Sequence, residues 1–212
     1  MMREPDLVMS VRRTLTILVA SVLVGGVSIP AHAQSASPKV VVKPAAKPEA
    51  KPAPAAAASV AGGAEPTLVG QFGTWGAYTA APNGKKVCFA LAKPASSKTN
   101  PPNRPRDPAY AFVSTRPAEK VVNEVSIMIG YALKPGSEST LEVGGGTYAM
   151  YTQGDGLWIK NAAEEEKMVE AMRKSPEVVV KGMSAKGTET IDTFSMKGLA
   201  QALDKLGQDC RR

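Results

Sequence analysis

Two cysteines have the most definite chemistry in this sequence. Cys88 and Cys210 are the only cysteines among the 212 residues. A single pair in an oxidising compartment is most simply a structural disulfide, whereas a Cys-x-x-Cys spacing would favour redox chemistry or metal binding. The spacing here is far longer than Cys-x-x-Cys, so we predict a Cys88–Cys210 disulfide that joins a strand to a C-terminal helix.

The other reactive side chains argue against most kinds of catalysis. The only histidine, His32, lies in a segment that we expect to be removed, which excludes Ser-His-Asp and Cys-His catalysis and histidine-containing metal sites. The cluster Glu164–Glu166 suits the first turn of a helix, where acidic groups complement the helix dipole. We predict no catalytic residue, no metal site and no cofactor. Two Ser-Lys pairs are chemically possible but fit capping and turn roles better: Ser184 with Lys186, and Ser195 with Lys197.

A basic, proline-rich segment, residues 93–108, is the best candidate for contact with a partner. We interpret it as a loop of about sixteen residues, long for a compact domain. A stiff, exposed and basic loop can bind an anionic partner with little loss of conformational entropy, although a merely solvated loop would have the same composition. The candidate binding residues are Lys93, Lys98, Arg104 and Arg106.

The elements that position these residues have mainly the patterns of strands. Short runs rich in β-branched and aromatic residues recur between turn signals, and Gln153–Gly156 is a hairpin turn. Two helices interrupt the strands, one capped by Asn161 and one capped by Ser195 and stopped by Gly207. We expect an antiparallel β-sandwich or barrel-like domain with two peripheral helices. The predicted strands cover residues 72–78, 86–91, 109–115, 124–131, 147–152, 157–160, 177–181 and 188–194.

The N-terminal segment indicates export. Arg12 and Arg13 precede an uncharged apolar run, Leu15–Val27, and small residues at Ala31 and Ala33 suit a signal peptidase. The run is shorter than the about 20 residues that span a bilayer. We therefore predict a cleavable signal peptide over residues 1–33, cut after Ala33, and no transmembrane segment after cleavage.

Two further regions follow the signal peptide. Residues 34–65 are nearly all Ala, Pro, Lys, Val and Gly and contain no aromatic residue, which predicts a disordered linker. The linker is either a spacer or a cationic arm that touches anionic surfaces. Residues 66–212 are enough for one domain with a core.

Four short segments of this domain together carry a family resemblance: Phe72-Gly-Thr-Trp75, Lys86-Val-Cys-Phe89, Gln153-Gly-Asp-Gly156 and Ser195-Met-Lys-Gly-Leu199. With these segments the chain resembles the invasion-associated locus B family. The similarity covers essentially all of residues 66–212, and the last segment is the most specific. The resemblance implies a β-sandwich exported to the periplasm or outer-membrane region of an α-proteobacterium, from a family linked to host-cell invasion without an established catalytic activity.

These observations predict a non-enzymatic binding module, periplasmic or secreted and associated with the outer membrane. Its expected partner is a cell-envelope or host-surface component. Nucleic acid is not expected, because export separates the protein from it and the basic residues lack interleaved aromatic side chains. Two alternatives stay open: a carboxylate-based hydrolase of cell-wall glycan, and a structural or stress-related envelope protein without a ligand. The sequence determines neither the ligand nor the oligomeric state.

Overall fold

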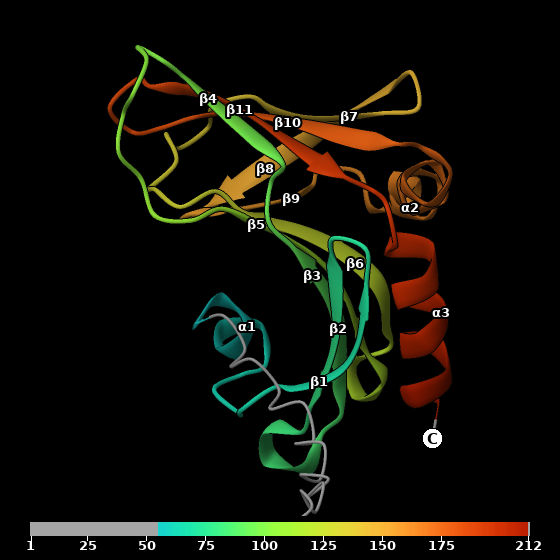
Figure 1. The fold of residues 1–212 in the computed structure, drawn as a ribbon. Coiled ribbons are helices and arrows are strands. Elements are labelled where there is room, and N and C mark those ends of the chain that lie inside the picture. Colours follow the sequence, from blue (N-terminus) through green and yellow to red (C-terminus); the bar gives the residue numbers. More distant parts are fainter. Residues whose placement is uncertain (1–54, 212) are drawn as a thin grey trace, which may run out of the picture. The chain divides into compact units, whose positions relative to one another are not determined.

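The computed structural model describes residues 55–211, with side chains from residue 57 onward (Figure 1). The predicted signal peptide and the first part of the predicted linker lie outside these residues. The strands are β1 (Thr67–Phe72), β2 (Trp75–Ala80), β3 (Val87–Ala92), β4 (Ser96–Asn100), β5 (Tyr110–Arg116), β6 (Val121–Met128), β7 (Ser139–Val143), β8 (Gly146–Gln153), β9 (Gly156–Ile159), β10 (Glu177–Met183) and β11 (Glu189–Ser195). The α-helices are α1 (Ala55–Val60), α2 (Glu165–Lys174) and α3 (Leu199–Asp209).

All strands belong to one open sheet with antiparallel neighbours. The order across the sheet is β1-β2-β3-β5-β6-β9-β8-β7-β10-β11-β4. The sheet bends strongly, so its two halves have different orientations (Figure 1). One half contains β1, β2 and β3, and the other contains β10, β11 and β4. The predicted mainly-β antiparallel fold with two peripheral helices is therefore confirmed, in the form of one continuous sheet.

The principal core lies between the inner face of this sheet and two amphipathic helices. Met168 and Met172 of α2 are buried, as their spacing of one helical turn predicts. Leu199, Leu203 and Leu206 form the buried stripe of α3. Both helices join one apolar cluster with inner-face residues of both halves of the sheet, so the bent sheet and its helices enclose a single core.

Two of the segments that carry the family resemblance are hydrogen-bonded to each other. The indole Nε1 of Trp75 donates to the Ser195 carbonyl at 2.9 Å, and the Thr74 amide donates to the Lys197 carbonyl at 3.1 Å. Gly198 lies against the Phe72 carbonyl with φ +98°, where a side chain would clash. The β1–β2 turn and the entrance to α3 thus form one packed unit.

The predicted disulfide is confirmed. Cys88 on β3 and Cys210 at the end of α3 are bonded, with their Cα atoms 6.1 Å apart. Both side chains are buried. The bond fastens α3 to the sheet and indicates an oxidising compartment outside the cytoplasm.

Several sequence expectations need correction. Residues 72–78 are not one strand: Gly73, with φ +55°, and Thr74 form a turn between the end of β1 and the start of β2. Ser195 does not cap α3: Gly198 occupies the N-cap position, and Ser195 Oγ accepts from the Lys197 amide. Gly207 does not stop α3, which continues to Asp209.

The linker and the basic segment also differ from expectation. Residues 55–60 of the predicted linker form α1, whose Ala57, together with Ala61, is buried against aromatic residues on the outer face of the sheet. Residues 93–108 are not one loop, because Ser96–Asn100 pair with β11 as an edge strand. The side chains of this strand are polar and mostly exposed, so the sequence lacks the alternation of apolar residues that would predict a strand.

Replacing both cysteines by alanine should destabilise the domain by roughly 2–5 kcal/mol, because the bond closes a loop of 122 residues in the unfolded chain. Urea unfolding followed by circular dichroism measures the loss. The wild-type protein unfolded with a reductant is the matched control and should lose a similar amount. Equal stability of oxidised and reduced protein would contradict the structural role.

Candidate functional site

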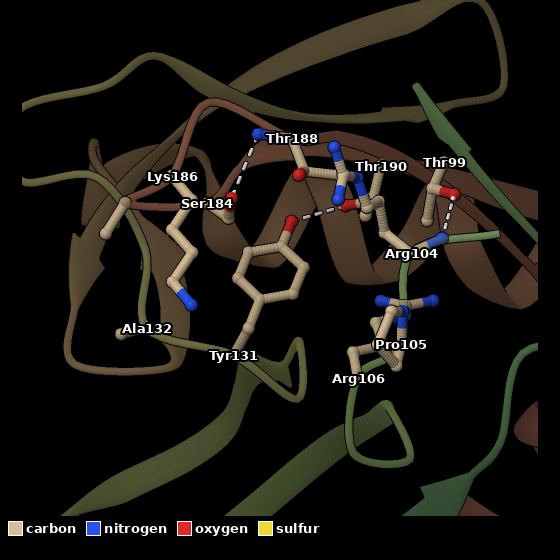
Figure 2. A pocket seen from close by; sticks show the side chains of 11 residues that line it. Thr99, Arg104, Pro105, Arg106, Tyr131, Ala132, Ser184, Lys186, Thr188 and Thr190 are labelled. Atoms are coloured by element: carbon tan, nitrogen blue, oxygen red, sulfur yellow. Dashed lines mark hydrogen bonds between the residues drawn. The ribbon is translucent and has the colours of Figure 1, made fainter. Parts of the chain in front are cut away.

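A cleft lies where the basic segment faces the turn between β10 and β11 (Figure 2). Its volume is about 540 Å³, within the range of small-molecule sites. Four stretches far apart in the sequence meet here: the end of β4, the segment after it, the residues after β6 and the β10–β11 turn. The lining residues are Thr99, Arg104, Pro105, Arg106, Tyr131, Ala132, Ser184, Ala185, Lys186, Thr188 and Thr190.

One buried ion pair fixes the wall that Arg106 contributes. Asp192 on β11 is fully buried, and the Arg106 guanidinium forms a bidentate pair with it. The same guanidinium donates to the Ile129 carbonyl at 2.9 Å, and Ser97 Oγ donates to Asp192 Oδ1 at 2.6 Å. Paired and hydrogen-bonded in this way, the buried carboxylate is stable only while the basic segment stays docked.

A second anchor holds the same segment by its backbone. The Asp107 amide donates to the Gly130 carbonyl at 3.0 Å. Gly130 has φ +79°, and a Cβ atom at this position would collide with the Asp107 carbonyl. A residue other than glycine at position 130 would therefore displace the segment that carries the arginines.

Hydroxyl groups line the opposite side of the cleft. Tyr131 Oη and Thr190 Oγ1 lie 2.5 Å apart and form a hydrogen bond in which either hydroxyl can donate, and burial raises the pKa of Tyr131. Ser184 Oγ accepts from the Thr188 amide at 2.9 Å and so orders the turn that carries Lys186. Figure 2 shows the Lys186 side chain extending past the Tyr131 ring.

The cleft is positively charged. Arg104 and Lys186 are exposed, whereas Arg106 is matched by Asp192 beneath it. Among the described residues, no aspartate or glutamate belongs to the lining. Two exposed cations beside hydroxyl groups are a chemical match for an anionic oxygen group such as a carboxylate or a phosphate.

The structure brings together only two of the four predicted binding residues. Arg104 and Arg106 line the cleft. Lys98 lies on the outer face of β4, opposite Ile191, and the Lys93 ammonium lies 5.6 Å from the centre of the Tyr110 ring. Sequence reasoning missed Lys186 as a partner of the arginines, because 80 residues separate it from Arg106 and only the β4–β11 pairing brings the segments together.

The residues considered for catalysis have structural contacts. Ser184 and Lys186 both line the cleft, but the Ser184 hydroxyl is directed to the Thr188 amide (Figure 2).

The predicted helix cap at Asn161 lies one short helical turn before α2, where the Asn161 side chain accepts a hydrogen bond from the Ala163 amide. Within the described part of the chain, no group of His, Cys, Asp or Glu side chains could hold a metal ion.

The acidic cluster at the start of α2 attaches the helix to the sheet. Glu165 Oε1 accepts from the Val125 amide of β6 at 2.8 Å. Burial raises the pKa of Glu165 above its ordinary value of 4.5, against the opposing effect of this hydrogen bond. Glu165, Glu166 and Glu170 line a separate hollow on α2, away from the cationic cleft.

These features define a disulfide-closed antiparallel β domain with a cationic cleft. The model of the invasion associated locus B (IalB) protein family matches residues 75–207, which is more than half of the chain. The protein belongs to the IalB family. No curated protein and no solved structure matches the chain. No helix among residues 55–211 is long and apolar enough to cross a membrane.

Replacing Arg106 by alanine should destabilise the domain by roughly 3–5 kcal/mol, because it leaves the buried Asp192 carboxylate without its charge partner. Chemical unfolding measures the change. Arg104→Ala is the matched control, since the exposed Arg104 should change stability by no more than about 0.5 kcal/mol. Equal effects of the two substitutions would show that the ion pair does not hold the segment.

Glu165→Gln should change the pH dependence of stability in a defined direction. The raised folded-state pKa means that the native protein binds the Glu165 proton more tightly than the unfolded chain does. Stability contributed by that proton is fully present below about pH 4.5 and is lost as pH rises through the folded pKa. The free energy of unfolding should be measured from acidic to neutral pH. As the pH rises, the wild-type protein should lose stability relative to Glu165→Gln, and Glu166→Gln, the control, should behave like the wild type. A gain for wild type over this interval would refute the assignment.

Proposed function

We propose that this protein is an exported, non-enzymatic binding module that recognises an anionic group on a cell-envelope or host-surface component through the cationic cleft. The location is periplasmic, or secreted and associated with the outer membrane. The predicted signal peptide and the disulfide support export. Family membership supports no finer statement of function.

The observation that carries the proposal is the composition of the cleft. Arg104 and Lys186 are exposed on opposite walls, and the described lining contains no carboxylate to neutralise them. Arg104 is held in place, because its amide donates to Thr99 Oγ1 at 3.2 Å and its neighbour Arg106 is pinned to Asp192. The backbone that carries Arg104 is therefore fixed before an anion binds, which limits the conformational entropy lost on binding.

The observed contacts favour binding over hydrolysis of cell-wall glycan. A glycosidase needs two carboxylates about 5–9.5 Å apart across a cleft. The described lining of the cationic cleft supplies none. The acidic hollow on α2 does contain carboxylates, but Glu165 is committed to the Val125 amide.

The test is co-sedimentation of the mature protein with purified peptidoglycan and outer-membrane vesicles at low and high salt. Binding should fall as salt rises, and Arg104→Gln combined with Lys186→Gln should weaken it by about tenfold, as expected when two cations lose their charge near a common anion. Lys85→Gln with Lys174→Gln is the charge-matched control, because both lysines are exposed and neither lines the cleft. Equal loss in both double variants would indicate non-specific attraction by net charge.

A catalytic role is tested on the same samples. Release of soluble glycan fragments from peptidoglycan by the wild-type protein, abolished by Glu166→Gln, would replace the binding proposal with the hydrolase alternative. Absence of binding in every fraction would leave a host-surface partner or a ligand-free structural role.

A further inference from the structure

A second hollow lies on the outer face of the sheet, opposite α3. One row of cross-strand neighbours on this face runs from β5 to β8 through Phe112, Ser126, Trp158 and Tyr151. Helix α1 covers the aromatic residues of β2, β3 and β5 at one end of the row. The hollow opens beside α1, where Ser59 and Val60 form one wall and Trp158 forms another.

The floor of the hollow is unusually polar for a sheet face. Ser114 and Ser126 are both buried, and Ser114 Oγ has no hydrogen-bond partner among the described residues. An unpaired buried hydroxyl costs free energy, and because Ser114 belongs to the lining of the hollow, a ligand group that reached its Oγ would remove this cost. Arg116 lies at the same hollow and forms a two-point ion pair with Glu124 at 3.0 and 3.1 Å.

Trp158 gives the hollow one aromatic wall, and Tyr151 lies next to it on the neighbouring strand. The rings of Trp158 and Tyr151 are stacked with centroids 5.7 Å apart and an interplanar angle of 22°. Tyr151 is 45% exposed, although it is one of the large hydrophobic side chains that folding normally buries. A flat, partly exposed aromatic pair beside planar polar groups suits a ligand with one apolar face and a hydroxylated edge.

The geometry points to a binding site for a neutral pyranose ring of a glycan chain in this hollow. The aliphatic C–H face of the sugar packs on Trp158, and its hydroxyls meet the serine floor and the Arg116–Glu124 pair. The volume of about 180 Å³ is below the range for drug-sized ligands, which favours a single ring of a chain that continues along the sheet face. This site is separate from the cationic cleft and does not depend on the proposed function.

The experiment is a titration of the mature protein with an N-acetylglucosamine tetramer and, separately, a glucose tetramer. Tryptophan fluorescence reports the hollow, because the other tryptophan, Trp75, is fully buried and bonded to Ser195. We expect a saturable change with at least one tetramer that is insensitive to salt. The two probes distinguish an acetamido sugar from a plain hexose. No saturable change with either probe would overturn the inference.

Variants separate this site from a general effect on folding. Tetramer affinity of the variants is measured by calorimetry. Trp158→Ala should weaken binding by roughly tenfold or more, because it removes the aromatic anchor, whereas Trp158→Phe should retain most of the affinity. Ser114→Ala should weaken binding by roughly fivefold without lowering stability, because it removes an unpaired buried hydroxyl. Ile191→Ala is the control, as an exposed apolar residue on β11, away from the hollow. Unchanged affinity in Trp158→Ala would refute the site.

The cleft variant makes the two proposals distinguishable. Arg104→Gln with Lys186→Gln should leave tetramer binding intact. If this double variant abolishes tetramer binding, the sugar binds in the cationic cleft and the inference about the hollow is wrong.

Discussion

The buried carboxylate of Asp192 is the constraint on which this end of the molecule depends. A fully buried negative charge is tolerated only with a positive partner and further hydrogen bonds. Ser97 and Arg106 supply them from a stretch that would otherwise have little apolar surface to bury. Because these contacts to Asp192 hold residues 96–106 against β11, β4 joins the sheet as its edge strand. The same contacts place Arg104 and Arg106 beside the β10–β11 turn. The cationic cleft is a geometric consequence of one buried acid.

The two faces of the sheet differ in how completely they are covered. The inner face buries its residues against α2 and α3 and is closed by the disulfide. The outer face is covered by α1 over only part of its width, and beyond that helix Trp158 and two buried serines line a hollow. The cleft at the β4 end and the hollow beside α1 differ in chemistry, one cationic and one aromatic with hydroxyls.

The sequence predicts correctly those elements whose buried apolar residues follow the alternation of a strand or the spacing of a helix. Gln153–Gly156 has the composition of a tight turn and forms one, and the Met168–Met172 spacing places both residues in the core. Ser96–Asn100 could not be recognised, because an edge strand held by backbone bonds and a single buried ion pair needs no apolar side chains. Lys186 could not be assigned to the site, since nothing local relates it to Arg104. The predicted role of Arg106 changed for the same reason: its partner Asp192 lies 86 positions later.

The order of strands has a consequence for how the molecule matures. Strand β4 pairs with β11, and Cys88 bonds with Cys210, so both joins connect segments about 100 residues apart. A chain that emerges from a ribosome or a membrane channel with its N-terminus first cannot complete either join until nearly all of the domain has appeared. Loop-closure entropy makes such distant contacts slow to form. While β1, β2, β3, β5 and β6 can pair with one another as they appear, β4 has no sheet partner and Cys88 remains a free thiol until the C-terminal part of the domain follows.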